Sequence, residues 1–285
     1  MSVMCRGLPT ALLLVSATQA QPPGDIELAF ARLYNFDFPG AHAHLDRHVA
    51  AYPRDPRGPA MHASAWLFFE LDRLGILESE FLADDRRIID KRKLRPDPGV
   101  RTKLFAAIDR AQALAMAALA ANPNDSNALF AMCIATGVVV DYTALIEKRQ
   151  WSSLGQVKRS AGYAQRLLKI DPSFTDAYLS TGLTEYLICS LPFFLRWFVR
   201  IDDIKGSKDV AVRNLDRVAR DGRYLRAFAK ILLAVLYLRE KQPSRTETLL
   251  AELARDYPEN PLFRKELAKL SAKLRNGELR DAGAR

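Results

Sequence analysis

The sequence predicts an all-α fold, a superhelical stack of antiparallel helix pairs interrupted by helical insertions. Apolar residues make up 49% of the 285-residue chain, and Ala and Leu dominate its long stretches, a composition that favours helix. Apolar positions recur with the period of an α-helix, and no run of β-branched and aromatic residues alternates long enough to indicate a sheet. Proline-containing breaks divide these helical stretches at intervals along the chain.

The breaks share a pattern that extends into the helices on both sides. Each holds a proline followed by a short polar run, and a small residue lies twelve positions before the proline and ten positions after it. The prolines are Pro53, Pro123, Pro172 and Pro258; the small residues before them are Ala41, Ala111, Ser160 and Thr246, and those after them are Ala63, Cys133, Gly182 and Ala268. A degenerate copy surrounds Gly222. Small residues at fixed offsets let two helices of a hairpin approach closely.

These offsets resemble the tetratricopeptide repeat, a helix–turn–helix unit of about 34 residues with a proline at the end of its second helix. The resemblance is strongest over residues 35–53, 111–137 and 155–186, and it is good over residues 211–270. Segments near residues 70–97, 138–153 and 188–206 interrupt the pattern, so insertions are expected there. The resemblance implies a stack with a concave face that binds a peptide or protein.

Helical periodicity and the breakers place the elements in order along the chain. Helices are expected near residues 25–36, 40–51, 58–74, 78–92, 99–121, 125–147, 154–169, 174–188, 191–202, 207–220, 223–239, 243–256 and 260–274. The repeat domain would therefore occupy residues 21–275. Residues 276–285, with two glycines and many charges, are expected to be a disordered tail.

The first 20 residues have the pattern of a secretory signal. Arg6 supplies one positive charge, residues 8–17 are mostly apolar, and residues 18–20 offer small side chains for cleavage before Gln21. The apolar stretch is too short to span a bilayer. Cys5 precedes that stretch, so it is not placed as a lipoprotein cysteine. The sequence therefore predicts a periplasmic or secreted protein with a cleaved signal peptide and no lipid anchor.

A net charge of +9 could indicate binding to nucleic acid or to a membrane surface. Basic residues are scattered among 33 acidic ones, and the densest basic run, residues 86–95, directly follows an acidic run. No basic motif with interleaved aromatics for nucleic acid is present. A solvated helix surface with ion pairs is the favoured interpretation, and no nucleic-acid partner is expected.

The candidate catalytic and metal-binding groups are few. His44 and His48 lie four residues apart on one expected helix, and His62 on the next helix could approach His48, which would allow a metal site. Packing in the hairpin seam is favoured for His48, because other copies carry Ala or Leu at its position. Cys133 and Cys189 lie in apolar helical sequence and are expected to be buried. The sequence therefore predicts a protein that is not an enzyme and needs no cofactor.

Binding is the function that the repeat resemblance implies, and the unusual segment is residues 191–200, with four aromatics and two arginines within eight positions. Core packing is favoured for this segment over partner binding, and both are favoured over membrane contact. The candidate binding residues are Tyr142, Tyr178, Tyr186, Arg196, Trp197 and Arg200. We expect a scaffold for protein or peptide partners in the cell envelope; the alternative is a small-molecule-binding accessory component of a periplasmic solute transport system.

Overall fold

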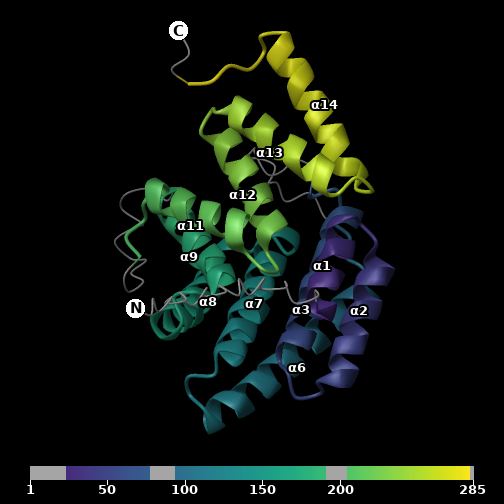
Figure 1. Cartoon of the computed structure of the whole chain (residues 1–285), viewed down its shortest axis with the longest axis vertical. Coiled ribbons are helices and arrows are strands. Elements are labelled where there is room, and N and C mark those ends of the chain that lie inside the picture. Colours follow the sequence, from purple (N-terminus) through teal and green to yellow (C-terminus); the bar gives the residue numbers. More distant parts are fainter. Residues whose placement is uncertain (1–23, 78–93, 191–203, 283–285) are drawn as a thin grey trace, which may run out of the picture.

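The computed structural model describes residues 24–77, 94–190 and 204–282, which form helices and contain no β-strand, so the all-α prediction is confirmed (Figure 1). The helices are α1 (Asp25–Tyr34), α2 (Phe38–Ala51), α3 (Arg57–Arg73), α6 (Pro98–Ala121), α7 (Ser126–Asp141), α8 (Gln150–Ile170), α9 (Tyr178–Ser190), α11 (Lys208–Asp221), α12 (Arg226–Arg239), α13 (Pro243–Asp256) and α14 (Pro261–Arg275). A π-helical turn, Tyr142–Ile146, continues α7, and a 3-10 turn, Thr175–Ala177, precedes α9.

The described helices stack in the pairs that the prolines predict. Each pair consists of the helix that ends at a break and the helix before it in the sequence. The pairs are α1 with α2, α3 with α6, α7 with α8, α9 with α11, and α12 with α13. Further contacts join each pair to the next, and α14 packs on α13 without a following helix among the described residues. The expected helices near residues 78–92 and 191–202 lie outside the described residues.

Small residues lie at the seams between the paired helices, as their spacing predicts. All four residues that precede the prolines by twelve positions are buried. Gly182 shows why size matters: a Cβ on it would lie 3.1 Å from the Asn214 Cβ and 3.2 Å from the Ala211 carbonyl oxygen of α11. Ala268 is the exception, because it lies on the exposed side of α14, where no described helix follows.

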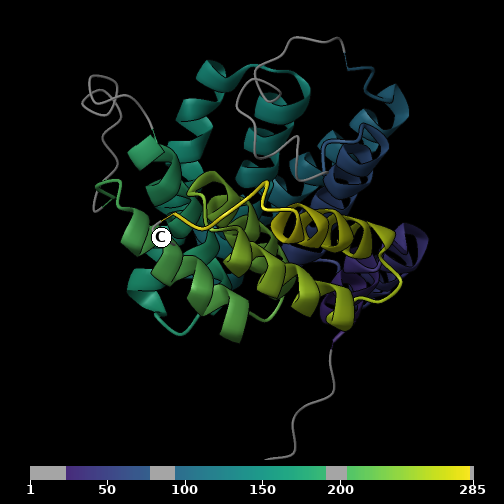
Figure 2. The ribbon, with the colours of Figure 1, turned by 90° about the horizontal axis from the view of Figure 1, so that it is seen from above.

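The stack also closes on itself, which the repeat pattern does not predict. Figures 1 and 2 show the base of α14 beside α1, at opposite ends of the described chain. The Asn260 side chain, fully buried, donates a hydrogen bond of 2.7 Å to the Tyr34 carbonyl oxygen. The Glu259 backbone N–H donates to the Asn35 side chain at 3.1 Å, and the Tyr34 hydroxyl donates to the Tyr224 carbonyl oxygen at 3.4 Å. The first helix pair is therefore bound to the last.

Aromatic side chains fill the space inside this closed stack. Phe68 of α3 meets Phe228 of α12 edge to face, with ring centroids 5.3 Å apart. Phe130 of α7 lies 4.8 Å from the Phe174 ring and 5.9 Å from the Tyr224 ring. Rings at these separations are in the range of packed aromatic pairs. The open concave face that the resemblance implies is thus occupied here by the chain's own side chains.

The end of the chain differs from the expected disordered tail over its described part. Residues 276–282 turn back after α14 and lie on the loop between α12 and α13 (Figure 1). The Ala282 backbone N–H donates to the Lys241 carbonyl oxygen at 2.7 Å, and the Asp281 carboxylate accepts from the Ser244 backbone N–H at 3.1 Å. Residues 283–285 lie outside the described residues.

Candidate functional site

The structure corrects two of the three tyrosines that the sequence places on a binding surface. Tyr142 is fully buried, because its ring packs edge to face against Phe105 of α6 in the core shared by α3, α6 and α7. Tyr186 is also buried, with 8% of its surface exposed. Burial of a large aromatic ring is favourable, so neither tyrosine is left to contact a partner directly.

Tyr178 is the tyrosine that stays partly exposed. Its hydroxyl donates to the Pro172 carbonyl oxygen at 3.3 Å, and the Arg217 guanidinium lies 4.2 Å from the centre of its ring. These contacts tie the end of one helix pair to α11. Tyr178 therefore stabilises the contact between the turn before α9 and α11.

Arg196, Trp197 and Arg200 lie outside the described residues. The described residues that follow that segment are held by Glu185 of α9, which is buried. Its carboxylate accepts hydrogen bonds from the backbone N–H groups of Gly206 and Ser207, at 2.7 and 2.8 Å. The return of the insertion to the stack is therefore anchored on α9, just before α11 begins.

The three histidines considered for a metal do not converge. His44 contacts Asp25, His48 contacts Asp55 at 3.0 Å, and His62 contacts Asp46 at 3.3 Å, so each meets a different carboxylate. His48 is buried in the hairpin seam, as its position in the repeat predicts. Within the described residues, no three His, Cys, Asp or Glu side chains are placed to hold a metal ion.

His62 of α3 also meets His42 of α2. Their Nδ1 atoms lie 2.9 Å apart, and the rings stack nearly parallel, with 12° between their planes. Trp66 covers the other side of His42, with ring centroids 4.0 Å apart. Burial, and then the neighbouring His62, lowers the pKa of His42 to about 4; burial also lowers the pKa of His62, although Asp46 opposes that shift.

This pair predicts a loss of stability at acidic pH. Both imidazoles are held neutral in the fold, whereas an exposed histidine in the unfolded chain titrates near pH 6.5. The unfolded chain therefore takes up more protons as the pH falls from about 7 toward 4, and the folded state loses stability there. Lys103 and Arg110 also face the pair, and their charges oppose its protonation. Because His42 is partly exposed, solvent screens part of the effect, and we expect a loss of about 1–2 kcal/mol.

Urea unfolding of wild type and His42→Gln at pH 7 and pH 5 measures this effect, because few carboxylates titrate in that interval. The unfolding free energy of wild type should fall more than that of the variant. His44→Gln, which changes the histidine paired with Asp25, is the matched control and should retain the wild-type dependence. An equal fall in wild type and His42→Gln would contradict the role of the pair.

Cys133 and Cys189 are both buried, and no disulfide joins them. Burial raises the pKa of the Cys133 thiol, and its sulfur lies 3.6 Å from the Ser160 hydroxyl oxygen. A thiol kept protonated in this way is a poor nucleophile. Cys133 therefore acts as a small residue at a helix seam.

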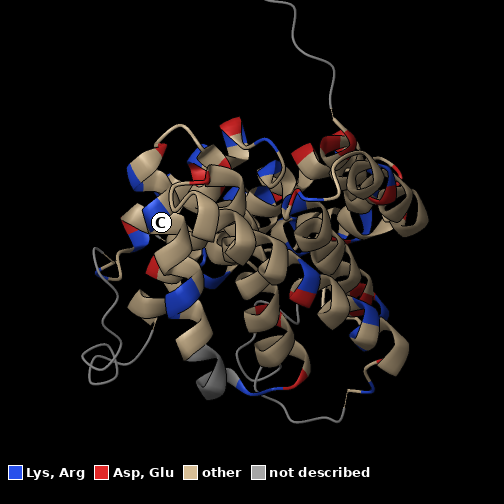
Figure 3. Ribbon diagram, turned by 90° about the horizontal axis from the view of Figure 1, so that it is seen from below, with Lys and Arg blue, Asp and Glu red and all other residues tan. Residues whose placement is uncertain are grey.

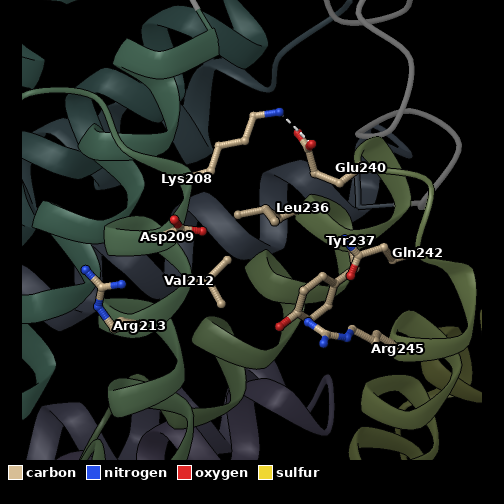
Figure 4. Close-up of a pocket in the computed structure, with 9 residues that line it drawn as sticks. All are labelled: Lys208, Asp209, Val212, Arg213, Leu236, Tyr237, Glu240, Gln242 and Arg245. Atoms are coloured by element: carbon tan, nitrogen blue, oxygen red, sulfur yellow. Dashed lines mark hydrogen bonds and ion pairs between the residues drawn. The ribbon is translucent and has the colours of Figure 1, made fainter. Parts of the chain in front are cut away.

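A surface pocket of about 340 Å³ lies where α11, α12 and the start of α13 meet (Figure 4). We call it the α11–α13 pocket. Its lining residues come from α11 (Lys208, Asp209, Val212 and Arg213), from α12 (Leu236, Tyr237 and Glu240) and from the start of α13 (Gln242 and Arg245). Apolar side chains thus form part of the wall, and charged side chains of both signs surround it.

Interactions within the lining leave some polar groups engaged and others available. The Lys208 ammonium binds the Glu240 carboxylate at 2.5 Å, which joins the start of α11 to the end of α12. The Arg245 guanidinium lies 5.1 Å from the centre of the Tyr237 ring. Arg213 makes no hydrogen bond or ion pair with another described residue, and its side chain is exposed at the edge (Figure 4).

Sequence reasoning missed this pocket because its residues come from three helices and carry no motif. The segment Lys205-Gly206-Ser207-Lys208 attracts attention only as an incomplete phosphate loop. In the structure, Ser207 is the N-cap of α11, and its hydroxyl accepts from the Val210 backbone N–H at 3.4 Å. Only the fold brings Lys208 against the end of α12.

Two described stretches, α6 and Ser126–Ile146, are long and apolar enough to cross a membrane by length and composition alone. The core helices of soluble proteins reach the same content, and α7 lies at the centre of the stack. Lys and Arg positions are interspersed with Asp and Glu positions along the ribbon in Figure 3, in keeping with the mixed charge pattern. No protein-family model matches the chain, and the search of curated proteins finds no match.

Proposed function

We propose that this protein is a non-enzymatic binding scaffold that holds a protein or peptide partner at the α11–α13 pocket. The observation that carries the proposal is the composition of the pocket, because exposed charged side chains surround the apolar part of its wall. The exposed residues are Lys208, Asp209, Arg213 and Arg245. A polar rim around apolar contacts is the usual composition of a protein-binding surface. Aromatic side chains fill the inside of the closed stack, so a partner would bind at an outer surface, and the α11–α13 pocket is one such surface.

The alternative, a small-molecule accessory component of a transport system, would be favoured by an enclosed pocket with convergent polar groups. The volume of about 340 Å³ lies at the small end of the range of ligand pockets. An exposed rim over such a volume fits a few side chains of a larger partner better than an enclosed ligand. Binding of a peptide or protein is therefore the preferred hypothesis.

Photocrosslinking in the native cell tests the function directly. A photoreactive amino acid at Val212, in the pocket wall, is expected to yield an adduct with a polypeptide. The same residue placed at Ala106, on the exposed side of α6, is the matched control and should yield none. A mass increase of only a few hundred daltons at Val212 would favour the small-molecule alternative, and the absence of any adduct would refute the pocket as a binding site.

We further propose that the scaffold is exported, on the basis of the N-terminal sequence pattern. Mature protein purified from its native cell is expected to begin near Gln21, without a lipid at its N-terminus. Intact-mass analysis together with N-terminal sequencing measures this. Soluble cytoplasmic protein that retains Met1 would contradict export.

A further inference from the structure

The polar groups left available in the α11–α13 pocket are mostly hydrogen-bond donors. Glu240 is engaged by Lys208, and no described residue makes a hydrogen bond to the guanidinium groups of Arg213 and Arg245 or to the side-chain amide of Gln242. Gln242 is the N-cap residue of α13, and its side chain makes no capping bond. Two arginines and such an amide around one pocket favour a ligand that carries a carboxylate, because arginine binds carboxylates with strong, charge-assisted hydrogen bonds.

The chain itself places a carboxylate at the edge of this pocket. Asp281 accepts from the Ser244 backbone N–H at the start of α13, next to Arg245 in the sequence. Hydrogen bonds from Ser244, and then the charge of Arg245, lower the pKa of Asp281. The next residue, Ala282, donates to the Lys241 carbonyl oxygen at 2.7 Å. A peptide segment with an acidic side chain therefore already binds the loop that supplies Gln242 and Arg245.

The other side of the pocket suits the rest of a peptide. Val212 and Leu236 offer apolar contact, and the Asp209 carboxylate, at the first turn of α11, makes no ion pair with another described residue. A free acceptor on the same helix as Arg213, across the pocket from Arg245, matches a peptide, which presents backbone N–H donors as well as an acidic side chain. A simple anion would use only the donor groups and not the Asp209 carboxylate.

We propose that the α11–α13 pocket, whose role as a binding site rests on the function proposed above, takes an acidic peptide segment. The chain's own residues 278–282 lie at its edge and compete with that segment. Asp281 holds the donor at the start of α13 until the carboxylate of the partner replaces it. Arg213, on the far rim, is free to receive the incoming segment first, and Arg245 contacts it once the tail moves aside.

Fluorescence anisotropy with a labelled glycine-spaced peptide of glutamate and leucine tests the proposal. The control probe carries glutamine in place of each glutamate. We expect the acidic probe to bind wild type at least about tenfold more tightly than the control at low salt, and its affinity to fall as salt is added. Equal binding of the two probes, or none by either, would overturn the assignment of an acidic segment.

Variants locate the binding and separate the tail from the pocket. Arg213→Ala with Arg245→Ala should weaken the acidic probe by about tenfold or more, which corresponds to the loss of one or two charge-assisted hydrogen bonds. Arg220→Ala with Arg264→Ala removes the same charge from exposed positions elsewhere and should leave the affinity near that of wild type. An equal loss in both double variants would overturn binding at the pocket. If the Arg245 change lowers the melting temperature, Arg213→Ala alone gives the same comparison.

Asp281→Asn addresses competition by the tail and should tighten the acidic probe several-fold. Unchanged or weaker binding would overturn that competition. Free glutamate, at an equal concentration of carboxylate, should fail to displace the probe; full displacement would show that the pocket recognises a carboxylate alone. If a polypeptide crosslinks at Val212 while the acidic probe shows no preference, the scaffold function stands and the acidic partner is wrong.

Discussion

Replacement of Asp176 by alanine is expected to lower the free energy of unfolding by about 3–5 kcal/mol. The carboxylate is 4% exposed and accepts hydrogen bonds of 2.9, 3.1 and 2.7 Å from three successive backbone N–H groups. These belong to Arg223, Tyr224 and Leu225, which lead into α12. Alanine would leave buried donors without an acceptor at the start of a helix, where negative charge is also favourable. Urea unfolding at pH 7 measures the loss.

Two further variants separate the hydrogen bonds from a general effect of removing charge. Asp176→Asn keeps one acceptor oxygen and should cost less than half as much as alanine. Asp171→Ala, in the exposed turn before the same helix pair, loses only bonds to Ser173 and should cost less than about 1 kcal/mol. Equal losses for Asp176→Ala and Asp171→Ala would show that Asp176 does not organise the start of α12.

The hydrogen bonds of Asp176 show why the repeat pattern predicts the helix pairs but not the contacts between distant helices. The spacing of prolines and small residues predicts helix pairs, because a proline ends a helix locally and small residues at fixed positions allow two neighbouring helices to pack closely. The prolines are Pro53, Pro123, Pro172 and Pro258. Asp176 lies four residues after Pro172 but serves the helix that begins some 50 residues later. Its partners are backbone groups, which every residue possesses, so nothing in the sequence marks them.

Closure of the stack escaped prediction for a related reason. Spacing relates each helix pair to the next one, whereas the bond from Asn260 to Tyr34 joins residues 226 positions apart. Tyr142 was misplaced because a tyrosine near the end of an apolar helix can face either way; the π-helical turn that starts there directs its ring onto Phe105. The α11–α13 pocket combines both difficulties, since its residues are distant and individually ordinary.

The aromatic centre of the closed stack supplies the second large expected effect. Phe130→Ala should lower the free energy of unfolding by about 3–5 kcal/mol, the range for deleting a fully buried phenylalanine ring. The ring is fully buried and contacts both Phe174 and Tyr224, so its loss leaves a cavity between α7 and the start of α12. Thermal and urea unfolding measure the cost.

Hydrogen exchange distinguishes closure from packing in general. In Phe130→Ala, amide protection should fall in residues 223–228 and in α1, because Tyr224 links the ring of Phe130 to the hydroxyl of Tyr34. The matched control is Phe105→Ala, which removes an aromatic ring that packs on Tyr142 in the other core cluster. That variant should lose stability while α1 and α12 keep their relative protection. If both variants loosen α1 to the same extent, the contact between the first and last helix pairs has no stability of its own, and closure is only a consequence of overall folding.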